Sequence, residues 1–145
     1  TFSYCFKNNS REYPATLKMN SVKKDLYFKD GQKKIHIRSL KVKHGNVDCT
    51  CYIIDKKLAY ISDVSDINKK DFKLLKNLKY LVIDCLWYRE HPSHLNLDKS
   101  LRLINTLSPK KAILTNLHSD LDYNELKKKL KKNIVPAYDG MKINL

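Results

Sequence analysis

Two short apolar runs, residues 80–83 and 112–114, flank a stretch with helical periodicity, and this order constrains the fold more than any other feature of the chain. Leu97, Leu101 and Ile104 recur at spacings of three and four residues, which places them on one face of a helix. The two apolar runs have the length of buried strands. Because strands and helices that alternate in this way form layered proteins, the second half of the chain predicts helices packed against a sheet.

The first third of the chain has short, partly alternating apolar segments, which predict strands. We therefore expect an N-terminal β meander followed by alternating helices and strands, an α/β (α+β) fold class. The expected strands are residues 15–19, 25–28, 34–38, 40–42, 48–54, 58–62, 80–85, 111–115, 134–135 and 141–143, and a turn is expected at residues 29–31. The expected helices are residues 69–77, residues 96–107 and one that Asp122 and Glu125 cap.

The length of 145 residues and the lack of a linker or repeat predict a single domain over residues 1–145. No apolar run approaches the roughly 20 residues of a membrane span, so no membrane partner is expected. The first residues lack the pattern of a secretion signal, and the four cysteines form no C-x-x-C pair. We therefore expect buried free thiols in a reducing compartment and a cytoplasmic location.

The net charge of +14 raises the possibility of a nucleic-acid partner. Only four of the 29 basic residues are arginine, which is the residue that base readout and bidentate phosphate contacts favour. The densest lysine run, residues 127–132, lies late in an expected helix, where lysines interact favourably with the helix dipole. Two interpretations of these lysines therefore stay open, a solvated helix face and a phosphate-binding patch. A basic nucleic-acid-binding module is the second hypothesis for the function.

Histidine and aspartate side chains lie at or just past the ends of four expected strands: His44, Asp63, Asp84 and His118. Loops at strand ends often carry functional residues, and imidazole and carboxylate groups are common metal ligands. The same residue types also form turns and helix caps at strand ends. The pattern by itself therefore leaves both a metal site and a structural role open.

Five segments occur in an order that resembles one known family. They are residues 60–66 (YISDVSD), 81–89 (LVIDCLWYR), 91–98 (HPSHLNLD), 112–123 (AILTNLHSDLDY) and 137–141 (AYDGM). Together they resemble the metallo-β-lactamase superfamily, in the branch that includes the phosphoribosyl 1,2-cyclic phosphate phosphodiesterases. Five segments in the right order are much more specific than any one of them.

The resemblance implies that His44 is a metal ligand and that Asp63 is a catalytic carboxylate that bridges two divalent ions, Zn²⁺ or Mn²⁺. It implies that His94 is a catalytic residue that donates a proton to the leaving group. Two neighbouring ions would lower the pKa of a bridging water and bind the oxygens of a phosphodiester. The last metal ligand is His118 or Asn116. Many members of the branch have a histidine where this chain has Asn116, and in this chain the histidine comes two residues later, as His118. A shift of two residues along an extended chain keeps the side chain on the same face, and imidazole is the better metal ligand, so His118 is favoured.

The family's His-x-His-x-Asp-His motif, which supplies most ligands of both metals, does not occur in this chain. In the family this motif belongs to the first half of an αββα sandwich, so we expect the chain to be the C-terminal half. This half alone is expected to hold at most one ion, weakly, and to be inactive. The complete protein is expected to hydrolyse a small cyclic or nucleotide-like phosphodiester, with a nuclease-like activity as a further alternative. An uncovered sheet would favour a homodimer.

Overall fold

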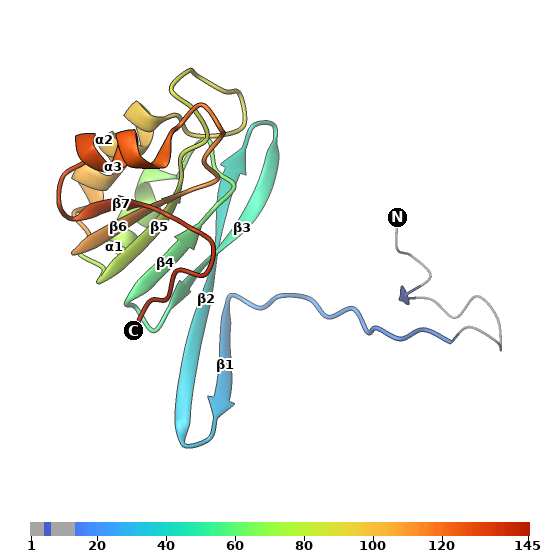
Figure 1. Cartoon of the computed structure of the whole chain (residues 1–145). Coiled ribbons are helices and arrows are strands. Elements are labelled where there is room, and N and C mark those ends of the chain that lie inside the picture. Colours follow the sequence, from blue (N-terminus) through green and yellow to red (C-terminus); the bar gives the residue numbers. More distant parts are fainter. Residues whose placement is uncertain (1–4, 7–13) are drawn as a thin grey trace.

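The computed structural model describes residues 5–6 and 14–145. Within this described part, seven strands form one sheet in which they lie in chain order (Figure 1). The strands are β1 (Asp25–Asp30), β2 (Lys33–His44), β3 (Val47–Ile54), β4 (Leu58–Ile61), β5 (Tyr80–Asp84), β6 (Lys111–Thr115) and β7 (Ile134–Pro136). The helical elements are η2 (Lys69–Asp71), α1 (Phe72–Leu75), α2 (Leu97–Leu107) and α3 (Tyr123–Lys129). The predicted α/β class is confirmed.

The first four strands form an antiparallel meander, because tight turns with positive φ angles connect β1 to β2 and β3 to β4. Gly31 (φ 58°) lies in the first of these turns, and Asp55 and Lys56 (φ 50° and 53°) lie in the second. From β4 onward the strands are parallel, and a helix follows each of β4, β5 and β6. Two antiparallel steps separate β2 from β4, so β2 runs in the same direction as β4, β5 and β6.

Two expected strands are wrong. Residues 15–19 lie outside the sheet, whose first strand is β1, and Met19 is 75% exposed, so the alternation in this segment marks no buried face. Residues 141–143 follow a turn at Gly140 (φ 84°) and form no strand. This C-terminal segment still contributes to packing, because Met141 and Ile143 contact the apolar side chains of the sheet.

The helices begin where the sequence predicts them to begin. Asn96 and Asp122 each accept a backbone N–H with a side-chain oxygen, at 3.0 and 2.9 Å, and thereby cap α2 and α3. The expected helix over residues 69–77 is shorter, because Lys76 is extended and Asn77 adopts a left-handed conformation (φ 57°). No helix in the described ranges is long and apolar enough to cross a membrane.

One face of the sheet is buried under the helices. Ile61, Ile83 and Leu114 stand in register on β4, β5 and β6, and each is fully buried. Helical side chains complete this core, namely Leu75, Ile104, Leu107 and Leu126. All four cysteines are free, as expected, but only Cys51 and Cys85 are buried, whereas Cys5 and Cys49 are half-buried. Burial raises the pKa of the Cys51 and Cys85 thiols to about 12.

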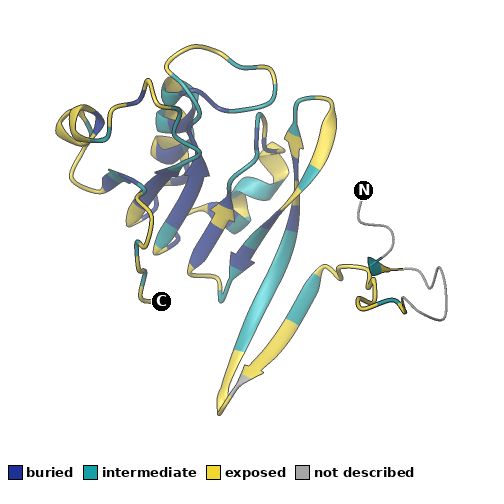
Figure 2. Ribbon diagram, turned by 45° about the vertical axis from the view of Figure 1, so that its right-hand side comes forward, coloured by how far each residue is buried: buried dark blue, intermediate teal, exposed yellow. Residues whose placement is uncertain are grey.

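The opposite face of the sheet is covered at one end only. Val82 and Ile113 pack against the C-terminal segment, whereas the surface toward β1 is open. Figure 2 shows the outer part of the β1–β2 hairpin as mostly exposed or half-buried. A hollow in this open face, which we call the apolar hollow, is lined by Leu26, Phe28, Ile37, Tyr52, Ile54, Leu58 and Tyr60.

We propose that the open face joins two copies of this chain in solution, since exposed apolar patches of this kind mark interfaces. Phe28 is 50% exposed and lines the apolar hollow. Phe28→Lys is expected to raise the dimer dissociation constant by about 10-fold or more, because a desolvated aromatic contact contributes roughly 1.5–3 kcal/mol. Sedimentation velocity over a concentration series measures this constant.

The matched control for this prediction is Val47→Lys, because Val47 is 59% exposed but does not line the apolar hollow. It is expected to leave the dissociation constant unchanged. A wild-type chain that remains a monomer at high concentration would contradict the proposal.

Candidate metal centre

Four polar residues lie at the ends of strands that run in the same direction. His44 and Asp84 are the last residues of β2 and β5, Asn116 directly follows β6, and Asp63 follows β4 by two residues. Because these four strands run in the same direction, their C-terminal ends meet at one edge of the sheet. The strand-end pattern therefore brings four of the polar residues together.

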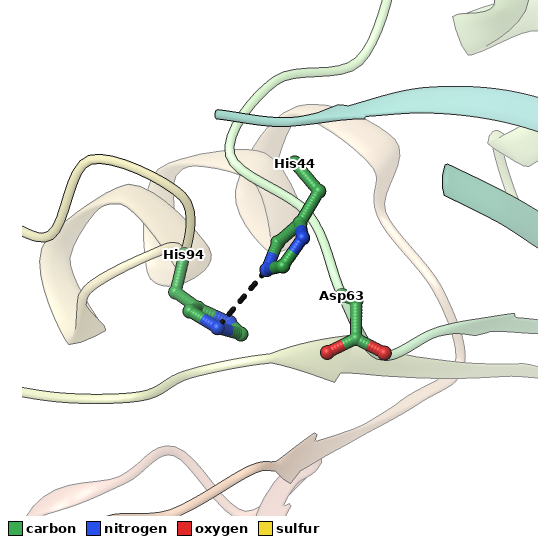
Figure 3. A group of neighbouring side chains, drawn as sticks. All are labelled: His44, Asp63 and His94. Carbon is green, nitrogen blue, oxygen red and sulfur yellow. Dashed lines mark hydrogen bonds between the residues drawn. The ribbon is translucent and has the colours of Figure 1, made fainter. Parts of the chain in front are cut away.

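His44, Asp63 and His94 form the candidate metal centre, and their side chains face a common space (Figure 3). Each offers one ligand atom, and these atoms lie within 4.8 Å of one another. The Nε2 atoms of His44 and His94 are 3.1 Å apart, and the two rings meet edge to face. Two imidazoles and a carboxylate suit zinc and related divalent ions, so the residues fit one such ion.

Two neighbouring side chains hold the Asp63 carboxylate. Ser62 Oγ donates to its Oδ2 (3.1 Å), and Asn116 Nδ2 donates to its Oδ1 (3.4 Å). Asn116 Nδ2 also donates to the Ser62 carbonyl (2.7 Å) and to Asp84 Oδ1 (3.2 Å). Asn116 therefore lies at the centre and acts through its amide N–H groups, which orient carboxylates and cannot ligate a cation.

Asp84 lies beside the centre and is fully buried. Its Oδ2 accepts the backbone N–H groups of Val64 and Leu95, both at 3.3 Å, and lies 2.8 Å from His94 Nδ1. Burial raises the pKa of the Asp84 carboxyl, and the hydrogen bond with His94 acts in the opposite direction. The sequence places this aspartate at a strand end but assigns it no role, because its burial is visible only in the structure.

His118 is not brought into the candidate metal centre. Its ring packs against Trp87 (centroids 4.6 Å apart), and its Nδ1 lies 3.5 Å from an Asp120 carboxylate oxygen. The expectation for His118 required an extended backbone from residue 116 to residue 118. The backbone is not extended there, because Asn116 is left-handed (φ 59°) and turns the following residues away. Trp87 Nε1 donates to Asp120 (2.7 Å), which fixes His118 in a separate cluster at the rim.

His91 lies next to the centre without joining it. Its ring centroid is 5.2 Å from that of His94, and its Nδ1 accepts the backbone N–H of Ser93 (3.3 Å). This contact closes a local turn in the loop between β5 and α2. The loop thereby presents His94 toward the sheet edge.

The chain matches one family model and several known proteins. The model of the beta-lactamase superfamily domain matches residues 1–116. A diphosphatase from the PhnP family has a similar solved structure, with 27% identity and a TM-score of 0.81 over 90% of this chain and 50% of that chain. The metallo-β-lactamase fold protein YhfI from Bacillus subtilis has 20% identity and a TM-score of 0.64, over 83% of this chain and 53% of that chain.

A curated relative extends the comparison. An octanoyltransferase from Porphyromonas gingivalis is 31% identical over 143 residues, which make up 95% of this chain and 28% of that protein. The chain thus spans little more than a quarter of this relative and about half of the similar solved chains. The family match over most of the chain, the shared fold and the cluster of His44, Asp63 and His94 agree with one another. The chain belongs to the metallo-β-lactamase superfamily.

Proposed function

We propose that this chain supplies the C-terminal half of the active site of a metal-dependent hydrolase that cleaves a phosphoric ester or anhydride. The observation that carries the proposal is the convergence of His44, Asp63 and His94 at one sheet edge. The similarity to a diphosphatase of the PhnP family supports a substrate with phosphorus–oxygen bonds. A small cyclic or nucleotide-like phosphodiester is the first candidate.

In this proposal His44 and Asp63 hold a divalent ion, Zn²⁺ or Mn²⁺. Such an ion polarises a phosphoryl oxygen and lowers the pKa of a bound water. His94 stands opposite them and donates a proton to the leaving group through Nε2, the atom that faces the centre. A second ion would also need Asp63, and its remaining ligands would come from a half that carries the His-x-His-x-Asp-His motif.

A polynucleotide is the second candidate substrate, because the net charge of +14 favours phosphate-rich partners. Part of the basic surface of α3 is engaged within the helix, since Lys128 Nζ donates to Glu125 (2.9 Å) and Lys127 Nζ lies 5.8 Å from the Tyr123 ring centroid. A small substrate therefore ranks first. Tight binding of single-stranded RNA with steep salt dependence would reverse this ranking.

The proposed activity is tested in a polypeptide that joins this chain to a half carrying the His-x-His-x-Asp-His motif. We expect it to hydrolyse bis(4-nitrophenyl) phosphate with Mn²⁺ or Zn²⁺, to lose the activity with EDTA and to regain it when metal is restored. The chain alone is expected to show little hydrolysis. His94→Ala should lower kcat by about 100-fold or more, as expected for the loss of a proton donor.

His118→Ala is the matched control for this test, because His118 lies outside the candidate metal centre. It is expected to retain most of the activity. Hydrolysis that EDTA does not affect, or that needs His118 but not His94, would contradict the proposal.

A further inference from the structure

We propose that Asp84 is a positioning residue that keeps the His94 proton on Nδ1 and thereby directs Nε2 into the candidate metal centre. The contact that carries this inference is the 2.8 Å distance between Asp84 Oδ2 and His94 Nδ1. An ionised carboxylate only accepts hydrogen bonds, so the proton of this contact belongs to the imidazole. The consequence for hydrolysis rests on the proposed function, whereas the position of the proton does not.

The surroundings of Asp84 show that both of its oxygens act as acceptors. Oδ2 receives the backbone N–H groups of Val64 and Leu95, and Oδ1 receives the side-chain amide of Asn116. A proton on either oxygen would face these donors. A lone pair on His94 Nδ1 would likewise face a carboxylate oxygen at 2.8 Å inside a buried site, which is repulsive.

The same assignment satisfies the contact on the other side of the ring. With Nδ1 protonated, a neutral His94 has its lone pair on Nε2, and this atom then takes the acceptor role in the 3.1 Å contact with His44 Nε2. His94 is thus contacted at both ring nitrogens, by Asp84 at Nδ1 and by His44 at Nε2. Nε2 would bind a metal ion through this lone pair, whereas as a proton donor His94 would first gain a second proton on Nε2 and pass it to the leaving group while Asp84 stays paired with Nδ1.

Asp84 also connects the segments that build the centre. Its hydrogen-bond partners are Val64 after β4, Leu95 before α2 and Asn116 after β6. One buried carboxylate therefore fixes three loops relative to β5. Because its two backbone donors bind the same oxygen as His94, an amide at position 84 would keep an oxygen there and still accept the Nδ1 proton.

The test is a long-range ¹H–¹⁵N correlation spectrum of the full chain labelled with ¹⁵N-histidine, at mildly alkaline pH and without metal. His94→Gln identifies the His94 signals. In the wild type nearly all neutral His94 is expected to carry its proton on Nδ1. Asp84→Leu should lower this fraction at least about twofold, because neutral imidazole without a partner distributes its proton over both nitrogens. Asp84→Asn should keep the wild-type tautomer.

Asp120→Leu is the matched control, because Asp120 is an exposed aspartate in the loop between β6 and α3 that contacts Trp87 and His118 but not His94. It is expected to leave the His94 tautomer unchanged. A wild-type His94 with its proton mainly on Nε2 would overturn the proposal, and so would an Asp84→Leu chain with the wild-type tautomer. If Asp84→Leu does not fold, the spectra of the wild type and of Asp84→Asn still test the proposal, because a His94 proton mainly on Nε2 in either chain would overturn it.

A kinetic readout separates this inference from the proposed function. In the joined polypeptide, Asp84→Leu should lower kcat for bis(4-nitrophenyl) phosphate by roughly 100-fold with little change in KM, and Asp84→Asn should restore most of kcat. Absence of metal-dependent hydrolysis in the wild type would reject the proposed function, while the tautomer would still decide the role of Asp84. Normal kcat in Asp84→Leu would reject the positioning role alone.

Discussion

Replacing Asp63 with alanine is expected to lower the affinity of the chain for Zn²⁺ or Mn²⁺ by about 100-fold or more. The change removes the only carboxylate of the candidate metal centre within the described residues and leaves two imidazoles. Loss of an outer partner of a metal ligand already costs about 10- to 100-fold in affinity, so loss of the ligand itself should cost at least as much. Isothermal titration of the chain with each metal measures the effect.

Asp66→Ala provides the control for this titration. Asp66 is exposed and lies in the same loop, but it does not belong to the candidate metal centre. Its loss is expected to change the affinity by less than twofold. Wild-type affinity in Asp63→Ala would show that Asp63 is not a ligand and would remove the observation on which the proposed function depends.

Leu114→Ala is expected to lower the free energy of unfolding by about 2–5 kcal/mol. Leu114 is fully buried on β6, in the core between the sheet and the helices, so the change leaves a cavity that the surrounding strands cannot fill. Because a domain of this kind has a total stability of about 5–15 kcal/mol, the variant should unfold at a much lower urea concentration. Urea denaturation followed by circular dichroism measures the shift.

Leu17→Ala makes the same chemical change at a 54% exposed position outside the sheet. Its effect should stay within about 0.5 kcal/mol. An equal loss of stability in the two variants would show that the face under the helices is not the main core. A small loss in Leu114→Ala alone would show that the core repacks around the missing side chain.

The parts of the fold that depend on local chemistry could be predicted from the sequence. The cap at Asn96, the cap at Asp122 and the turn at Gly31 each depend on residues close in the chain, and all three are present in the structure. The expected strand over residues 15–19 failed for a different reason. A strand needs a neighbouring strand to pair with, and alternation along one segment does not show whether a neighbour exists.

Part of the candidate metal centre could be predicted, up to the point where the backbone changes direction. The strand-end pattern left a structural role open, and the family resemblance implied His44 and Asp63 as metal ligands and His94 as a proton donor. The structure brings these three side chains together. The place of His118 depended on an extended backbone, which the positive φ angle of Asn116 excludes. Hydrophobic periodicity carries no information on the sign of a single φ angle, so this part could not be predicted.

The strand order of the sheet has a consequence for the sequence of events in folding. Each strand pairs with the strand that precedes it in the chain. Short turns join the antiparallel strands β1 to β4, so their pairing requires little loss of loop entropy and favours rapid folding, whereas the parallel pairs from β4 onward must close longer crossover connections. During synthesis the sheet can grow from β1 toward β7 while the chain emerges from the ribosome. The three side chains of the candidate metal centre are then present once His94 has been added, and Asn116, which donates to Asp63, follows.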